Sequence, residues 1–164
     1  MEKFKIVEAG RVYANQMAPH LRPGDVLELQ RSSGLNPLDA LLESVRLSDD
    51  DMCWAATYNG LPVAMFGAND MKPVDDPAYA DITIGGIWLL ATFGIHHNKL
   101  DFFRKCREYL AVMHERYEYL TNFVDAQNVA TMIWLPRLGF RPVQQVDRFG
   151  YAELPFIQYV SKRK

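Results

Sequence analysis

Residues 119–140, YLTNFVDAQNVATMIWLPRLGF, decide the fold, because a short strand runs directly into an amphipathic helix that ends at a glycine and an aromatic residue. Asn128 stands at the start of this helix, where its side chain can cap free backbone N–H groups. Gly139 permits a left-handed residue after the last turn, and Phe140 can then fold back onto the core. Taken alone, these features favour a structural role.

A second strand-to-helix unit precedes this one. Residues 82–92, ITIGGIWLLAT, are apolar nearly throughout, which predicts a strand in the middle of a sheet. After a turn at residues 93–99, apolar side chains recur at three- and four-residue intervals, which predicts a long helix over residues 99–117. Asn98 is placed to cap this helix. A strand, a helix and another strand in succession imply a parallel crossover within a mixed sheet.

The first half of the chain is predicted to supply two helices and an antiparallel hairpin. A brief helical pattern over residues 11–21 is interrupted by the Pro23-Gly24 break. In NPLDALLESVRLS, residues 36–48, asparagine can cap the helix and proline occupies its first position. The remaining predictions are strands at 52–58 and 61–67 joined by Asn59-Gly60, an exposed loop at 69–79, and two C-terminal strands that turn near Gly150.

Length and composition limit the classes of function. The 164 residues, 49% of them hydrophobic, predict a single domain over residues 1–164. A net charge of -2 provides no global positive field, so neither a nucleic-acid partner nor a membrane surface is expected. The N-terminus lacks a signal-peptide core, which predicts a cytoplasmic protein. Cys53 and Cys106 lie in apolar patterns and read as free thiols, and the four histidines lack the spacing of a metal site.

The predicted fold class is therefore α+β: a central mixed, mostly antiparallel sheet with one splayed pair of parallel strands, flanked by helices. Where two parallel strands splay and each runs into a helix, a crevice opens at their carboxyl ends, and such crevices commonly bind ligands. The helix that begins near Asn98 points its free backbone donors at this crevice, which makes it a suitable site for an anion.

The combined pattern resembles the GNAT N-acetyltransferase superfamily. Over nearly its full length the chain is similar to GNAT-like proteins of short-tailed bacteriophages and prophages, some of which are called internal virion proteins. The resemblance is carried by Asp25 and Glu28 (D..E), CWAATYNGLPVAMFG at 53–67, GIWLLAT at 86–92, FVDAQN at 123–128, WLPRLGF at 134–140, and LPFIQY near the end.

The resemblance implies a site for acetyl-coenzyme A between the splayed strands. Asn128 would contact this cofactor from the second strand, while Lys99, with Arg104 and Lys105, would add positive charge for its phosphates; a solvated helix face is the alternative role for these cations. The pantetheine arm would pair with backbone groups of Trp88, Leu89, Leu90 and Ala91, and the pyrophosphate would accept hydrogen bonds from Gly94, Ile95, His96, His97, Asn98 and Lys99.

Two departures from the family pattern concern chemistry. The phosphate-binding turn usually holds further small residues, which allow close backbone approach, and here it keeps only Gly94. Many relatives place a tyrosine four residues before the glycine of the GF ending, where it protonates the departing thiolate, and this sequence has Leu135. Leucine cannot donate a proton, so Tyr159, His96 or water must serve as the acid, or transfer is slow or absent.

Acetylation of an amine also requires a group that removes a proton from the ammonium. The strand at 82–90 carries no carboxylate in its middle. Asp25 and Glu28 are expected between the first two helices, on the acceptor side, so Glu28 is the candidate base and Tyr159 the candidate acid. Surface hydrogen bonding or helix capping is the alternative role for Glu28.

Two functions follow from the resemblance. The first is a phage-encoded acetyltransferase that transfers acetyl directly to an unknown amine, on a protein or a small molecule, in the host cytoplasm. The second is a catalytically degenerate protein of the same fold that acts inside the virion, in assembly, or by binding a host factor; Leu135 leaves the choice open. The exposed edge of a mixed sheet also predicts a homodimer.

Overall fold

The computed structural model describes residues 3–71 and 75–164, and within them seven strands form one mixed sheet in the order β1-β2-β3-β4-β5-β7-β6. Neighbouring strands are antiparallel except β4 and β5, which are parallel. The predicted α+β fold class is confirmed. The strands are β1 (Lys5–Glu8), β2 (Cys53–Tyr58), β3 (Leu61–Asp70), β4 (Ile84–Ala91), β5 (Tyr119–Asp125), β6 (Arg141–Phe149) and β7 (Leu154–Lys162).

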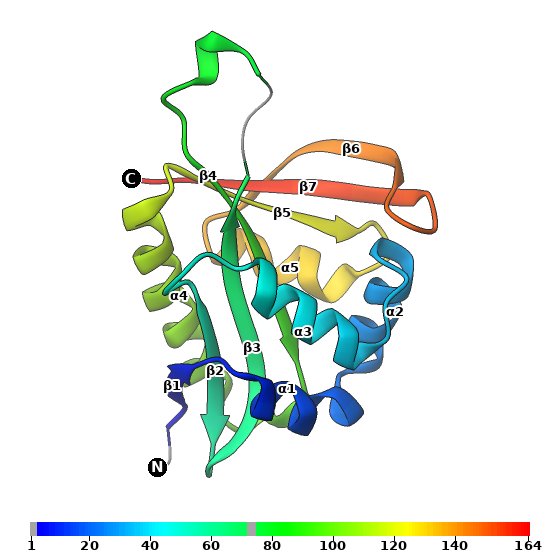
Figure 1. Cartoon of the computed structure of the whole chain (residues 1–164), viewed down its shortest axis with the longest axis vertical. Coiled ribbons are helices and arrows are strands. Elements are labelled where there is room, and N and C mark those ends of the chain that lie inside the picture. The colour runs from blue at the N-terminus through cyan, green and yellow to red at the C-terminus, as the bar shows by residue number, and fades with distance from the viewer. Residues whose placement is uncertain (1–2, 72–74) are drawn as a thin grey trace.

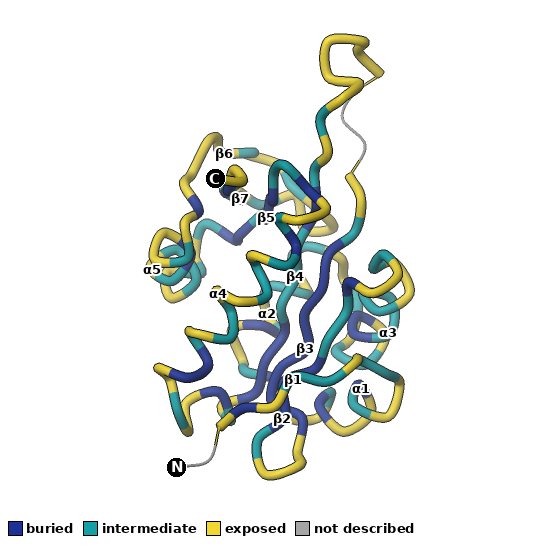
Figure 2. Tube along the Cα trace, turned by 90° about the vertical axis from the view of Figure 1, so that its left-hand side faces the viewer, coloured by how far each residue is buried: buried dark blue, intermediate teal, exposed yellow. Residues whose placement is uncertain are grey.

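Helices cover both faces of the sheet (Figures 1 and 2). One apolar cluster joins α1 and α3 to one face, and a larger cluster joins α4 and α5 to the other face. The helices are α1 (Arg11–Met17), α2 (Pro23–Ser32), α3 (Pro37–Leu47), α4 (Lys99–Arg116) and α5 (Val129–Arg137), with short 3-10 turns at Ala18–His20, Pro77–Tyr79 and Phe93–Asn98. In the part of the chain that the structure describes, no helix combines the length and apolar character needed to cross a membrane.

The two strand-to-helix units form as their local patterns predict. Asn98 accepts a hydrogen bond from the Asp101 N–H at the start of α4, and Asn128 accepts one from the Thr131 N–H at the start of α5. Gly139 has a φ of 93°, as expected for a left-handed residue after a helix. The prediction that the chain then folds back onto the core is also confirmed, since residue 140 is 3% exposed.

The hairpin forms at Asn59-Gly60, whose φ values of 53° and 77° are those of a tight turn between antiparallel strands. The second strand of this hairpin is longer than predicted and ends at Asp70 rather than at residue 67. Part of the loop predicted at 69–79, residues 72–74, lies outside the described residues.

The first helical segment does end before Pro23-Gly24, but the expectation that a linker follows is wrong, because these residues begin the helix α2. Proline suits the first turn of a helix, where its missing N–H has no intrahelical partner, and its fixed φ favours the helical conformation. Asp25 and Glu28 therefore do not lie in a linker between helices. They lie within α2, three residues apart, and so share one face of the helix.

Candidate active site

The parallel strands β4 and β5 separate after a short paired segment. They pair only between residues 84–86 of β4 and 119–121 of β5. Beyond this point β4 stays paired with β3 as far as Ala91, and β5 stays paired with β7 as far as Asp125. An opening therefore lies between the carboxyl-terminal halves of the two strands, where ligands bind in sheets of this kind.

Helix α2 crosses this opening and is attached to both strand ends. At the β4 end, Asp25 Oδ2 accepts a 3.0 Å hydrogen bond from the Ala91 N–H, and the Ala91 carbonyl accepts one of 2.9 Å from the Arg22 N–H. At the β5 end, Arg31 Nη1 lies 3.0 Å from Asp125 Oδ2. Glu28 is midway along α2 and so lies over the gap between the strands.

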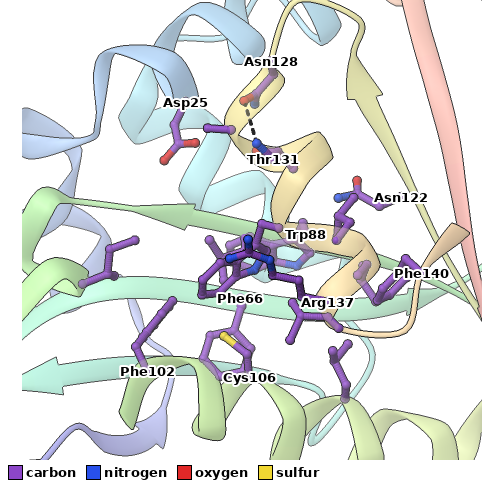
Figure 3. Close-up of a pocket in the computed structure, with 18 of the residues that line it drawn as sticks. Asp25, Phe66, Trp88, Phe102, Cys106, Asn122, Asn128, Thr131, Arg137 and Phe140 are labelled. Atoms are coloured by element: carbon purple, nitrogen blue, oxygen red, sulfur yellow. Dashed lines mark hydrogen bonds between the residues drawn. The ribbon is translucent and has the colours of Figure 1, made fainter. Parts of the chain in front are cut away.

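A cavity of about 390 Å³, here called cavity one, lies on the α4 and α5 side of the opening (Figure 3). Its wall is largely apolar, with Phe66 from β3, Phe102 from α4 and Leu135 from α5 among the lining residues. Polar and charged groups from three helices and the turn before α4 border it: Arg22, Glu28, His96, Lys99, Asn128 and Arg137. An apolar channel with cations at its border suits a ligand that has a flexible apolar arm and an anionic end.

The hydrogen bonds at the two ends of β4 show which way its backbone groups point. The Thr92 N–H donates to the Val63 carbonyl, and the Met71 N–H donates to the Ile84 carbonyl, both at 2.8 Å. The register between β3 and β4 is continuous between these bonds. Because backbone groups alternate in direction along a strand, the even-numbered residues of β4 bond to β3.

The odd-numbered residues of β4 consequently point their N–H and carbonyl groups toward the opening. Beyond the segment paired with β5, these residues are Ile87, Leu89 and Ala91. Ala91 is already bonded to α2, whereas β5 does not reach Ile87 or Leu89. The backbone edge that faces cavity one is thus that of Ile87 and Leu89, and the backbone groups of Trp88 and Leu90 face β3.

Glu28 and Asn128 are in direct contact. Asn128 Nδ2 donates a 2.7 Å hydrogen bond to Glu28 Oε2, while its Oδ1 accepts from the Thr131 N–H. The helix cap therefore sets the orientation of the amide and directs its donor at Glu28. Burial, with a smaller contribution from the nearby Asp25 carboxylate, raises the pKa of Glu28 above its usual value, although the Asn128 bond opposes this shift.

A second cavity of about 290 Å³, here called cavity two, lies on the α3 side of the opening. It includes Ser44 of α3 and Phe149 of β6, neither of which borders cavity one. The residues that border both cavities are Asp25, Glu28, Ile87, Trp88, Leu89 and Asn122. The two cavities therefore meet at the splayed strands, and Glu28 faces both.

In the turn before α4, side-chain oxygens accept hydrogen bonds from nearby backbone N–H groups. Thr92 Oγ1 accepts a 3.1 Å hydrogen bond from the Gly94 N–H, and Asn98 caps α4. A Cβ on Gly94 would lie 2.4 Å from Val63 Cγ1, so the glycine is required for packing against β3. Of the predicted phosphate donors at 94–99, the Gly94 N–H therefore already has a partner, and the Ile95 N–H donates to the Thr92 carbonyl at 3.4 Å.

The two histidines of this turn have different environments. The His97 ring stacks on Tyr58 with 4.7 Å between ring centroids, and His97 does not line cavity one. His96 does line cavity one, beside the cations Arg22 and Lys99. Partial desolvation and then these two cations lower the pKa of His96 below its usual value.

Of the candidate proton donors His96 and Tyr159, only His96 lines a cavity described above, and the usual tyrosine position is held by Leu135. Leu135 lines cavity one and is 4% exposed, so an apolar group occupies this part of the wall. Tyr159 is buried in β7 within the core and lines neither cavity. The structure brings Glu28, Asn128 and His96 to cavity one and leaves Tyr159 outside it.

Some site residues were not predicted from the sequence. Asn122 lies in the middle of β5, which also carries Thr121 and Asp125, so no contrast within the strand marks it. Arg137 lies in the last turn of α5, where a solvated cation is common, and no local pattern marks it as a residue that borders a cavity.

Known protein structures share this architecture. The ribosomal-protein-alanine N-acetyltransferase from Brucella melitensis matches with a TM-score of 0.68 at 13% identity, covering 97% of this chain and 99% of that one. An agmatine N-acetyltransferase matches with a TM-score of 0.68 at 10% identity, over 99% and 100% of the two chains. The fold is GNAT-like. At these identities the likeness shows the fold alone.

A third similar structure is the aminoglycoside N(6')acetyltransferase from Legionella pneumophila subsp. pneumophila str. Philadelphia 1. It has a TM-score of 0.62 and 12% identity, and the match covers 99% of this chain and 93% of that one. No family model matches the sequence, and no curated protein matches it.

Proposed function

We propose that this chain is an N-acetyltransferase that binds acetyl-coenzyme A in cavity one and receives a primary amine from cavity two. The observation that carries the proposal is the position of Glu28, a half-buried carboxylate at the border of the two cavities. A base at this position faces an amine on one side and a thioester on the other. The GNAT-like fold supports the cofactor class, since the similar structures are described as acetyltransferases.

The lining of cavity one fits this cofactor. The unpaired backbone edge at Ile87 and Leu89 can receive amide groups of a pantetheine arm as an added strand would. Apolar walls suit the arm, and His96 and Lys99 border the cavity where phosphates would be held. Arg22 borders it too, but its guanidinium is already paired with Asp25. His96 would act there as a hydrogen-bond donor. Because the Gly94 and Ile95 N–H groups already have partners, we expect side-chain cations to carry more of the phosphate binding than in a glycine-rich turn.

Glu28 acts as the general base in the proposed mechanism. When bound, acetyl-coenzyme A supplies an activated acetyl thioester. Glu28 takes a proton from the acceptor ammonium, and its raised pKa brings it closer to the pH at which proton transfer is efficient. Asn128 holds the carboxylate at the border of the cavities. Leu135 gives no proton to the departing sulfur, so water serves as the acid.

The test is Glu28→Gln, which preserves shape and removes the base. We expect kcat to fall by about 100-fold or more, with the affinity for acetyl-coenzyme A unchanged in calorimetric titration. Release of free coenzyme A thiol in the presence of amines measures kcat, and mass spectrometry identifies the acetylated product. An unchanged kcat would remove Glu28 from the mechanism, and an absence of acetyl-coenzyme A binding in the wild type would end the proposal.

A second candidate function is a protein that keeps this fold without turnover. Two observations favour it: the apolar Leu135 in the wall of cavity one, and the turn before α4 that is closed by Thr92 and Asn98. Assignment to phage-encoded proteins, in the host cytoplasm or in a virion, rests on the sequence resemblance. Leu135→Tyr distinguishes the two candidate functions. The added hydroxyl in cavity one should raise kcat if the chain is an acetyltransferase, and should produce no turnover if the chain has lost catalysis.

A further inference from the structure

The charges that line cavity two are of one sign. Asp25 and Glu28 are the charged residues among the described residues of the lining, which contains neither lysine nor arginine. Asp25 is engaged by the Arg22 guanidinium, at 2.9 Å, and by the Ala91 N–H. Glu28 accepts a hydrogen bond from the neutral Asn128 amide, so of the two carboxylates it is the one not paired with a cation. A ligand that carried its own carboxylate or phosphate would meet no counter-charge among the described lining residues.

The wall of cavity two combines polar side chains, such as Asn69, Thr121 and Asn122, with apolar and aromatic ones. Trp88, Phe123 and Phe149 all line it. Phe149 stacks on Phe123 with 4.8 Å between ring centroids and 14° between ring planes, and Trp88 Nε1 donates a 2.8 Å hydrogen bond to Ser48 Oγ. These contacts hold the aromatic faces in place. Fixed aromatic surfaces bind a flat apolar group by stacking and favour an adjacent ammonium.

The turn between β6 and β7 lies against the C-terminal end of α2. The Tyr151 N–H donates to the Ser32 carbonyl at 2.9 Å, and the Ala152 N–H donates to the Arg31 carbonyl at 3.0 Å. Ser32, which accepts one of these bonds, and Phe149, which precedes the turn, both line cavity two. The turn thus encloses this side of the cavity, and the volume of about 290 Å³ suits a compact small molecule.

We infer that the acceptor is a small primary monoamine with an aromatic or apolar body, bound in cavity two with its ammonium at Glu28. This inference rests on the proposed function, because it assigns the acceptor of that reaction. Among the described lining residues an amino acid's carboxylate would have no cationic partner and a diamine's second ammonium no free carboxylate, so we expect both to be poor acceptors. Trp88, Phe123 and Phe149 are the residues that set this specificity.

The first test compares 2-phenylethylamine with phenylalanine, which adds a carboxylate, with putrescine, which adds a second ammonium, and with a short unmodified peptide. At saturating acetyl-coenzyme A we expect kcat/KM for 2-phenylethylamine to exceed the others by at least about tenfold. Acetyl-coenzyme A affinity is measured separately. If the cofactor binds and the peptide, putrescine or phenylalanine is preferred, the acceptor assignment is overturned and the proposed function stands.

A matched pair of variants on α3 tests whether the acceptor amine binds in cavity two. Ser44 lines cavity two and not cavity one, while Leu47 is 52% exposed and lines neither. Ser44→Lys places a competing cation in the cavity and should raise KM for 2-phenylethylamine by at least about tenfold, with acetyl-coenzyme A affinity unchanged. Leu47→Lys adds the same charge outside and should change neither quantity.

Ser44→Leu fills the same space without a charge and should also raise KM, so the test holds even if the lysine variant folds poorly. Titration of 2-phenylethylamine without cofactor gives a binding readout that does not depend on turnover. Equal amine affinity in the wild type and Ser44→Leu would overturn the location, and an absence of amine binding in the wild type would overturn the inference.

Discussion

Asn128 Nδ2 donates a 2.7 Å hydrogen bond to Glu28 Oε2, although the two residues are 100 positions apart in the sequence. The contact joins the helix that follows β5 to the helix that crosses the splayed strands. The same amide caps α5, so a local feature of the helix start also positions a carboxylate between two cavities. This relationship underlies the proposed chemistry and its pH dependence.

Glu28→Gln should stabilise the protein at pH 8. The folded-state pKa of Glu28 is raised above 4.5 by burial. The folded chain therefore binds this proton more tightly than the unfolded chain, and the associated stability is present below pH 4.5 and lost as pH rises through the folded pKa. Urea denaturation should show the variant to be more stable than the wild type at pH 8, with the difference vanishing near pH 4. A stability difference between variant and wild type that is the same at pH 4 and pH 8 would contradict the raised pKa of Glu28.

Gly94→Ala should destabilise the fold by about 1–3 kcal/mol, since the added Cβ would lie 2.4 Å from Val63 Cγ1 and overpack the contact with β3. The double variant Gly94→Ala with Val63→Ala should recover part of this loss. Thermal or chemical denaturation measures both. If Gly94→Ala alone keeps wild-type stability, the glycine is not required for packing, and a role in close approach to a ligand regains support.

Arg31→Ala should cost about 2 kcal/mol of stability, because Asp125, whose side chain is 5% exposed, would lose its ion-pair partner at the end of β5. The control is Arg46→Ala, which breaks an exposed pair with Glu43 and should cost less than about 1 kcal/mol. Because Arg31 also attaches α2 to the opening, its loss should raise KM for the acceptor. Equal stability losses in the two variants would show that α2 is held by other contacts.

Cys106 should resist alkylation in the folded protein. It lines cavity one, and burial raises the pKa of its thiol to about 12, so the reactive thiolate is scarce at pH 8. Mass spectrometry after iodoacetamide treatment should show modification at least about tenfold slower in the native than in the urea-unfolded chain. Rapid native modification would indicate that cavity one is open to solvent at this depth.

Local patterns predicted most of the architecture, because hydrophobic periodicity and helix capping act within a few residues. The helix expected at 99–117 is observed at Lys99–Arg116, and both asparagine caps form. Helix α2 was missed because Pro-Gly is common in turns as well as in first helical turns, and the contacts of α2 with the strand ends, which favour the helix, are not visible in the sequence. The direction of the β4 backbone groups depends on the register with β3, which the sequence does not specify.

The site was predicted less completely than the fold. Glu28 and Asn128 were each identified as candidates, but their contact depends on the path of α2 across the opening. Tyr159 looked suitable because it carries a hydroxyl, whereas its strand directs it into the core, away from both cavities. The packing of Gly94 on Val63 is likewise a contact between distant segments.

Calorimetric titration with acetyl-coenzyme A tests the central claim most directly, with a matched pair on α5. Ala130 lines cavity one, and its neighbour Val129, 58% exposed, does not. The wild type and Val129→Trp should bind with micromolar affinity, about -8 kcal/mol, and Ala130→Trp, which fills the cavity, should bind at least about tenfold more weakly. Absence of wild-type binding at two temperatures, or equal affinity in both variants, would contradict the assignment of cavity one to this cofactor.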